Sequence, residues 1–150
     1  LLKNNQPQAA AWVTGNTSAP QLSGLVKFYD TPYGGVLIES ELFGLPNIQT
    51  SGSSDFYAMH IHENGDCSQS FTKTGEHYNP QHRLHPYHAG DLLPVLGNQG
   101  YAWEAFYDKR FSISDILGRS VVIHSDSDDF SSQPSGNSGN KIGCGMIRRV

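Results

Sequence analysis

The chain has 150 residues and a formal net charge of −4, so it lacks the basic surface typical of nucleic-acid binding. No apolar run approaches the ~20 residues of a membrane-spanning helix. Charged residues make up only 16%, whereas Gly (16) and Pro (8) are frequent, which favours short strands and turns over long amphipathic helices.

The first part of the chain alternates short apolar segments with turn residues. Residues 1–9 are polar and expected to be loose, and residues 10–150 are expected to form one domain. Strands are predicted at residues 11–13, 25–29, 36–42 and 56–62. A Thr-Pro-Tyr-Gly-Gly turn joins the second and third of these, which indicates a hairpin.

Two long loops separate the remaining strands. Residues 64–100 are rich in His, Pro and Gly, and a loop this long in a compact domain is usually functional or disordered. A second polar loop spans residues 125–140. Strands are predicted at 101–107, 121–124 and 142–147, with a turn or single helical turn at 114–118. Many short strands with two long loops indicate an all-β antiparallel sandwich or barrel.

Two cysteines, Cys67 and Cys144, lie far apart in the sequence. A disulfide between them would stabilise the fold by roughly 4–5 kcal/mol in the chain-entropy model. Two buried free thiols are the alternative. A disulfide would indicate an oxidising compartment. The chain starts at Leu1 without Met and shows no signal peptide, which agrees with removal of an upstream segment.

Seven histidines form the strongest signal in the chain. His60 and His62 are two apart on a predicted strand, so both rings leave the same face. A denser group of ligand-type residues lies in the first long loop: His77, His82, His85, His88 and Asp91. Neutral imidazole is the commonest metal ligand, and a carboxylate adds charge compensation.

Other readings of these histidines stay open on residue type alone. The strand pair and the loop group could each be solvated, and His124, at the end of an apolar strand, could be a satisfied core residue. Taken together, seven ligand-type residues suffice for two metals that share one ligand. Four nitrogens suit Cu(II) and a tetrahedral nitrogen and oxygen set suits zinc, but spacing does not say which histidine serves which metal.

Several motifs, in the same order, resemble those of the copper/zinc superoxide dismutase family, and the likeness runs from about Trp12 to Ile147. The motifs are His60–Ser68, Gly75–Pro80, His88–Leu92, Gly118–His124, Gly136–Gly139 and Gly143–Gly145. The short zinc loop is more similar to bacterial members than to animal ones. The resemblance implies an all-β, Greek-key antiparallel β-barrel or sandwich of immunoglobulin-like type, with two long functional loops.

The resemblance also implies a role for individual residues. The copper ligands would be His60, His62, His77 and His124. The zinc ligands would be His77, His85, His88 and Asp91, so that His77 bridges the two ions, while His82 matches no ligand. Asp128 resembles the carboxylate that hydrogen-bonds one ligand of each ion. Cys67 and Cys144 match the intrasubunit disulfide of the family.

The activity implied by the resemblance is disproportionation of superoxide to oxygen and hydrogen peroxide, with copper and zinc ions as cofactors. Zinc has no redox chemistry, so copper would carry the electron. His77 would exchange the proton, and Lys141 would attract the anion. The expected compartment is extracytoplasmic or secreted because of the disulfide. Relatives are dimers or monomers, so a homodimer stays open.

Three features depart from the family pattern. Lys141 stands where an arginine is common, which keeps the charge but loses the planar fork. Only Pro86 and Tyr87 separate His85 from His88. The loop at 125–140 is short and holds no Lys or Arg, which predicts weaker long-range steering of the anion.

Three other functional classes compete with this reading. A non-enzymatic member of the same fold is disfavoured because all four copper-type histidines are present. A zinc hydrolase needs an open metal position, and the sequence has no H-E-x-x-H signature. A purely structural β-sandwich would leave the histidines unexplained.

Overall fold

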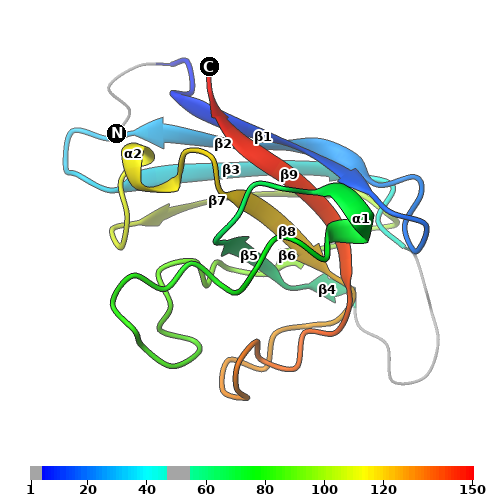
Figure 1. Cartoon of the computed structure of the whole chain (residues 1–150). Coiled ribbons are helices and arrows are strands. Elements are labelled where there is room, and N and C mark those ends of the chain that lie inside the picture. Colours follow the sequence, from blue (N-terminus) through cyan, green and yellow to red (C-terminus); the bar gives the residue numbers. More distant parts are fainter. Residues whose placement is uncertain (1–4, 47–54) are drawn as a thin grey trace.

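The computed structural model describes residues 5–46 and 55–150, which form nine strands and two four-residue helices (Figure 1). The strands are β1 (Ala9–Gly15), β2 (Ser23–Asp30), β3 (Val36–Phe43), β4 (Phe56–Tyr57), β5 (Met59–His62), β6 (Val95–Leu96), β7 (Ala102–Asp108), β8 (Ser120–His124) and β9 (Lys141–Arg149). The helices are α1 (Ser68–Phe71) and α2 (Ile113–Ile116). The predicted all-β fold is confirmed.

Seven strands form one antiparallel sheet in the order β5-β8-β9-β1-β2-β3-β7, and β4 pairs with β6 in a second, two-stranded sheet. The large sheet curls around a core because alternate side chains of each strand are apolar. In β1, for example, Ala9, Ala11 and Val13 are buried, and in β3 Val36 and Ile38 are buried. The two long loops extend from the same lower side of the sheet in Figure 1.

The predicted hairpin is confirmed as β2 and β3, which pair from Ser23 and Phe43 to Asp30 and Val36. The connecting turn is closed by Thr31 Oγ1, which donates to the Gly34 carbonyl at 2.7 Å. Gly34 and Gly35 have φ angles of 74° and 72°, a region that residues with a Cβ rarely adopt. The turn chemistry therefore fixes the register of the hairpin.

The single strand predicted at residues 56–62 is wrong. β4 pairs with β6, whereas β5 pairs with β8, and Ala58 separates them. The Ala58 N–H donates to the Asp126 carbonyl at 3.0 Å, and the His124 N–H donates to the Ala58 carbonyl at 2.9 Å. These bonds to the far end of β8 and its following loop divert the chain from one sheet to the other.

The first strand begins at Ala9, the last residue of the segment expected to be loose. Residues 1–4 lie outside the described part of the chain, so the division into residues 1–9 and 10–150 stays a prediction. Among the described residues, no helix has the length and apolar character that crossing a lipid bilayer requires.

Candidate metal centre

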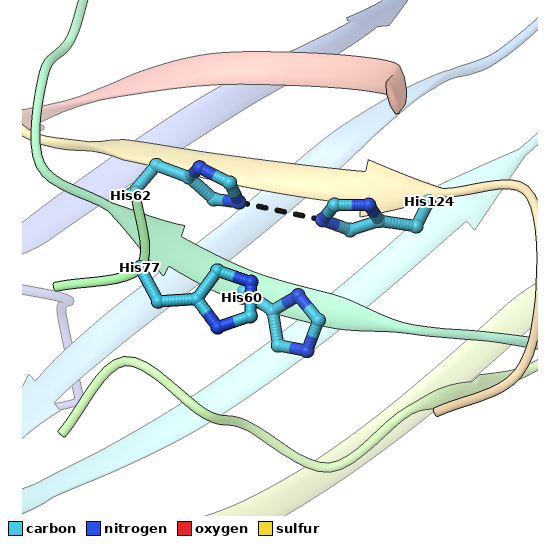
Figure 2. Close-up of side chains that lie close together, drawn as sticks. All are labelled: His60, His62, His77 and His124. Atoms are coloured by element: carbon cyan, nitrogen blue, oxygen red, sulfur yellow. Dashed lines mark hydrogen bonds between the residues drawn. The ribbon is translucent and has the colours of Figure 1, made fainter. Parts of the chain in front are cut away.

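Neighbouring strands and the first long loop bring four histidines together (Figure 2). His60 and His62 come from β5, and His124 ends β8, the strand that pairs with β5. His77 approaches from the loop, where it forms a β-bridge with His62. The alternation of β5 sends both of its rings to the same side, as the sequence predicted, and there they meet His124 and His77.

These four rings form a compact, buried donor group. One ligand-type atom from each of His60, His62, His77 and His124 lies within 4.8 Å of the others. His62 Nε2 is 3.3 Å from His124 Nε2, and the rings of His60 and His77 have their centroids 3.9 Å apart (Figure 2). Such an arrangement of imidazole nitrogens suits a transition metal such as copper.

A second donor group surrounds the carboxylate of Asp91. His77 Nδ1 lies 2.8 Å from Asp91 Oδ1, and His85 Nδ1 lies 3.1 Å from Asp91 Oδ2. His88 Nδ1 lies 3.2 Å from Asp91 Oδ2 and 3.2 Å from His77 Nδ1. His60 also comes within the 4.8 Å range of His77, His85 and Asp91. Three nitrogens and one carboxylate are a donor set that zinc prefers.

Asp128 hydrogen-bonds to one histidine of each donor group. Its Oδ2 accepts a hydrogen bond from His60 Nε2 at 2.9 Å, and its Oδ1 accepts one from His85 Nε2 at 2.7 Å. Burial acts to raise the pKa of Asp128, but these two hydrogen bonds outweigh it and lower the pKa to about 2. The carboxylate therefore stays ionised, and it fixes both imidazoles with Nδ1 free of hydrogen.

Gly136 lets the second long loop pack against this carboxylate. Its φ is +71°, and a Cβ added there would lie 1.9 Å from Asp128 Oδ1 and 2.6 Å from His85 Nε2. The N–H of Phe130 in the same loop donates to Asp128 Oδ1 at 2.8 Å. The loop at 125–140 thus holds Asp128 in place.

Unpaired nitrogens show that the residues fit two ions. His60 Nδ1, His77 Nε2 and His85 Nδ1 are buried and make no hydrogen bond among the described residues; the 3.1 Å contact of His85 Nδ1 with Asp91 Oδ2 lacks hydrogen-bond geometry. Leaving a buried polar atom unpaired costs about 1–3 kcal/mol, so such atoms are uncommon unless they bind something. All three belong to the two donor groups, which is the pattern expected of metal ligands.

Burial favours the neutral form of His60, His62, His88 and His124, which metal binding requires. It lowers the pKa of His60 to about 4, against the opposing effect of the hydrogen bond to Asp128. It also lowers the pKa of His124 to about 3, and the pKa of His62 and of His88 falls for the same main reason. At neutral pH these imidazoles therefore offer lone pairs.

A pocket of about 370 Å³ opens onto the first donor group and includes His62, His77, His124 and Lys141 in its lining. Lys141 is the only lysine or arginine among the described residues that line this pocket. Its Nζ donates to Thr74 Oγ1 at 2.7 Å and lies 3.5 Å from the carbonyls of Phe71 and Gly75. The exposed His82 also lines this pocket but belongs to neither donor group.

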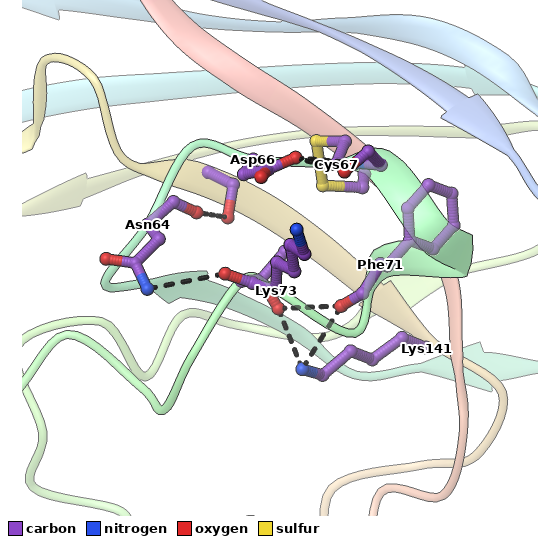
Figure 3. Close-up of a disulfide and its surroundings, with 10 residues drawn as sticks. Asn64, Asp66, Cys67, Phe71, Lys73 and Lys141 are labelled. Carbon is purple, nitrogen blue, oxygen red and sulfur yellow. Dashed lines mark hydrogen bonds between the residues drawn. A yellow bond between two sulfur atoms is a disulfide. The ribbon is translucent and has the colours of Figure 1, made fainter.

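The predicted disulfide between Cys67 and Cys144 is confirmed (Figure 3). It ties the loop that follows β5 to β9, three residues beyond Lys141. Figure 3 shows Lys141 reaching back from β9 to the Phe71 carbonyl of that loop. The disulfide and the lysine thus join the same two segments.

Sequence reasoning did not single out Thr74 or Arg110. Thr74 accepts the hydrogen bond of Lys141, and Arg110 donates to the carbonyls of His88 and Asp91. Lys141 and Thr74 are 67 positions apart, and Arg110 is 22 positions from His88, so no local spacing could have revealed either contact.

Comparisons with known proteins agree on one family. The family model described as copper/zinc superoxide dismutase (SODC) matches residues 22–147. The chain is 33% identical over 156 residues to the Cu-Zn superoxide dismutase 3 of Arabidopsis thaliana, covering 93% of this chain and 89% of the relative. It is 34% identical over 137 residues to the extracellular Cu-Zn superoxide dismutase of Mus musculus, covering 85% of this chain but only 54% of that relative.

A solved structure of similar fold is the crystal structure of the clock protein EA4. It superposes with a TM-score of 0.81 at 30% sequence identity, and the match covers 98% of each chain. The likeness thus extends over nearly the whole chain and includes both long loops.

Proposed function

The chain belongs to the copper/zinc superoxide dismutase family, and on that premise we propose that it disproportionates superoxide to oxygen and hydrogen peroxide. The observation that carries the proposal is the position of His77 between two donor groups. Its Nδ1 lies beside Asp91 and His88, whereas its Nε2 is buried and unpaired near the other histidines. One imidazole can therefore serve two ions.

We assign His60, His62, His77 and His124 to copper and His77, His85, His88 and Asp91 to zinc. His60 comes near both groups, but its Nε2 is committed to Asp128, so it has one free nitrogen for one ion. His88 is preferred for zinc because its Nδ1 lies 3.3 Å or less from both His77 Nδ1 and Asp91.

Copper, when bound, supplies one-electron redox chemistry, and zinc supplies a charge that holds the shared imidazole. The side chains supply the rest of the reaction. His77 can take and release a proton at Nε2, which has no hydrogen-bond partner among the described residues, while Nδ1 stays directed at Asp91. Asp128 keeps the rings of His60 and His85 oriented.

Lys141 attracts and orients the superoxide anion. Among the described residues that line the pocket it is the only lysine or arginine, and the lining also includes Glu63 and Glu76. With a net charge of −4 on the whole chain, this local positive site offsets the general repulsion of an anion.

We also propose that the protein works outside the cytoplasm and as a homodimer. The Cys67–Cys144 disulfide and the match to extracellular enzymes support the first proposal. For the second, the support is an apolar groove of about 660 Å³ lined by Trp12, Leu25, Met146 and the disulfide.

The decisive experiment uses the copper-loaded protein with and without zinc. We expect zinc to change the EPR and visible spectra of the copper, because the two ions share His77. His77→Gln is expected to abolish this sensitivity to zinc and to reduce dismutation, whereas the exposed loop variant His82→Gln leaves both unchanged. Identical copper spectra with and without zinc in the wild-type protein would refute the shared ligand.

A further inference from the structure

Arg110 is an arginine outside both donor groups whose guanidinium reaches the backbone of two proposed zinc ligands. It follows β7 and precedes α2. Its Nη1 donates to the His88 carbonyl at 2.9 Å, and its Nη2 donates to the Asp91 carbonyl. Both contacts lie on the backbone side of the turn, whereas the side chains of His88 and Asp91 point to His77.

The guanidinium is itself held by Asp108 at the end of β7. Its Nε lies 3.0 Å from Asp108 Oδ1, and its Nη2 lies 2.7 Å from Asp108 Oδ2. The side chain of Asp108 is only 6% exposed, so this forked pair is shielded from water on one side. Arg110 therefore has a fixed position relative to the sheet.

The turn that receives these bonds is short and internally closed. The Asp91 N–H donates to the His88 carbonyl at 3.0 Å, and the His88 N–H donates to Asp91 Oδ2 at 2.9 Å. Within the turn, Gly90 is attached to β5, because its carbonyl accepts a hydrogen bond from the Ile61 N–H at 2.8 Å. For the backbone of His88, the hydrogen bond from Arg110 is the only one among the described residues that comes from outside this turn.

We propose that Arg110 is a positioning residue of the zinc site, which fixes the His88–Asp91 turn so that His88 Nδ1 and the Asp91 carboxylate converge on His77. The compressed loop, with only Pro86 and Tyr87 between His85 and His88, makes the direction of the His88 ring depend on where its backbone is held. The planar fork of arginine can reach two carbonyls and one carboxylate together, and a lysine cannot. The proposal rests on the zinc-ligand assignment of the proposed function.

The test compares Arg110→Lys with Arg83→Lys in the purified, disulfide-intact protein. Arg83 is an exposed arginine of the loop that carries His85, His88 and Asp91, and its guanidinium makes no hydrogen bond or ion pair among the described residues. Zinc affinity is measured by competition with a chromophoric chelator, and ligand geometry by the visible spectrum of Co²⁺ bound in place of zinc. Copper affinity of the zinc-free protein serves as the internal reference.

We expect Arg110→Lys to weaken zinc binding by ~10- to 100-fold, the range found for residues that orient metal ligands, and to change the Co²⁺ spectrum. Copper affinity and the Arg83→Lys protein are expected to match wild type. Wild-type zinc affinity with an unchanged Co²⁺ spectrum in Arg110→Lys would overturn the inference. Equal losses of copper and zinc affinity would also overturn it, because they indicate general destabilisation.

Asp108→Asn gives the same test if Arg110→Lys yields too little folded protein. The amide keeps the size of the side chain but weakens the fork that holds the guanidinium, so a smaller loss of zinc affinity is expected. Failure of the wild-type chain to bind Co²⁺ or zinc at all would refute the ligand assignment itself, whereas normal wild-type binding with an unaffected variant would refute only the role of Arg110.

Discussion

At Lys141 the position of a single ammonium group depends on a loop far away in the sequence. Its Nζ donates to the hydroxyl of Thr74, a residue with no exposed surface, and Thr74 in turn donates to the Phe71 carbonyl at 3.1 Å. Burial lowers the pKa of Lys141, and the nearby Glu76 acts in the opposite direction. The lysine is thus held at the pocket by neutral oxygen acceptors and, among the described residues, makes no direct ion pair, which leaves its charge available to an anion.

Replacing Lys141 by alanine should lower kcat/KM for superoxide by ~10-fold and flatten its dependence on ionic strength, because local attraction acts within about one Debye length of 8–10 Å. Stopped-flow or pulse-radiolysis rates between low and high salt measure this. Lys73→Ala, which removes an exposed lysine of the loop that carries Thr74, is the matched control. An unchanged rate and salt profile in Lys141→Ala would remove the lysine from the reaction.

Glu104 carries a partly buried carboxyl group that no functional argument uses. It faces the interior from β7, where its Oε1 has no hydrogen-bond partner among the described residues, and burial raises its pKa to about 7. A raised carboxyl pKa means that the folded state binds the proton more tightly than the unfolded state does. The stability that protonated Glu104 contributes is therefore present below its ordinary pKa near 4.5 and is lost as pH rises to about 7.

Glu104→Gln should therefore be more stable than wild type at pH 8, by about 1–2 kcal/mol because water screens part of the charge, and the difference should disappear below pH ~4.5. Urea unfolding of the metal-free proteins at several pH values provides the comparison. A difference that does not vary with pH would show that the carboxylate is solvated in the folded state.

At the level of strands and loops, the elements that could be predicted are those whose formation depends on residues close together in the sequence. The hairpin of β2 and β3 was predicted because its turn residues and alternation lie within one segment. The split of residues 56–62 into β4 and β5 was missed because it arises from bonds of Ala58 to a loop 68 positions later. The ligand residues were proposed through a family resemblance, whereas Thr74 and Arg110 depend on contacts between distant segments.

The disulfide is the covalent link between the loop after β5 and the strand that carries Lys141. Cys67 and Cys144 are 77 positions apart, so the double variant Cys67→Ser with Cys144→Ser should lower the free energy of unfolding by about 4–5 kcal/mol. Urea unfolding of the metal-free protein measures this, and chemical reduction of the wild-type disulfide should reproduce the loss. A change below about 1 kcal/mol would mean that noncovalent contacts alone hold the loop, since most surface changes fall in that range.

On the scale of the whole molecule, the outer face of the large sheet carries exposed apolar side chains. Trp12 points outward from β1, with 68% of its surface exposed, and it is the cross-strand partner of Leu25, which is 42% exposed. The groove beside them is lined by Met146 and the disulfide. The proposed homodimer would use this groove as its interface, because a second copy of the chain would bury these exposed apolar groups.

Trp12→Glu should therefore convert a dimer into a monomer, because the variant replaces an exposed apolar side chain that lines the groove with a charged one. Sedimentation velocity across a range of protein concentrations gives the mass, and Tyr33→Glu, at an equally exposed aromatic in the β2–β3 turn, is the control that should remain dimeric. The thermal midpoint of the wild type should rise with protein concentration, and that of Trp12→Glu should not. A wild-type protein that sediments as a monomer at every concentration would exclude this interface, and the activity of the isolated chain would then show that one copy is sufficient for the metal centre.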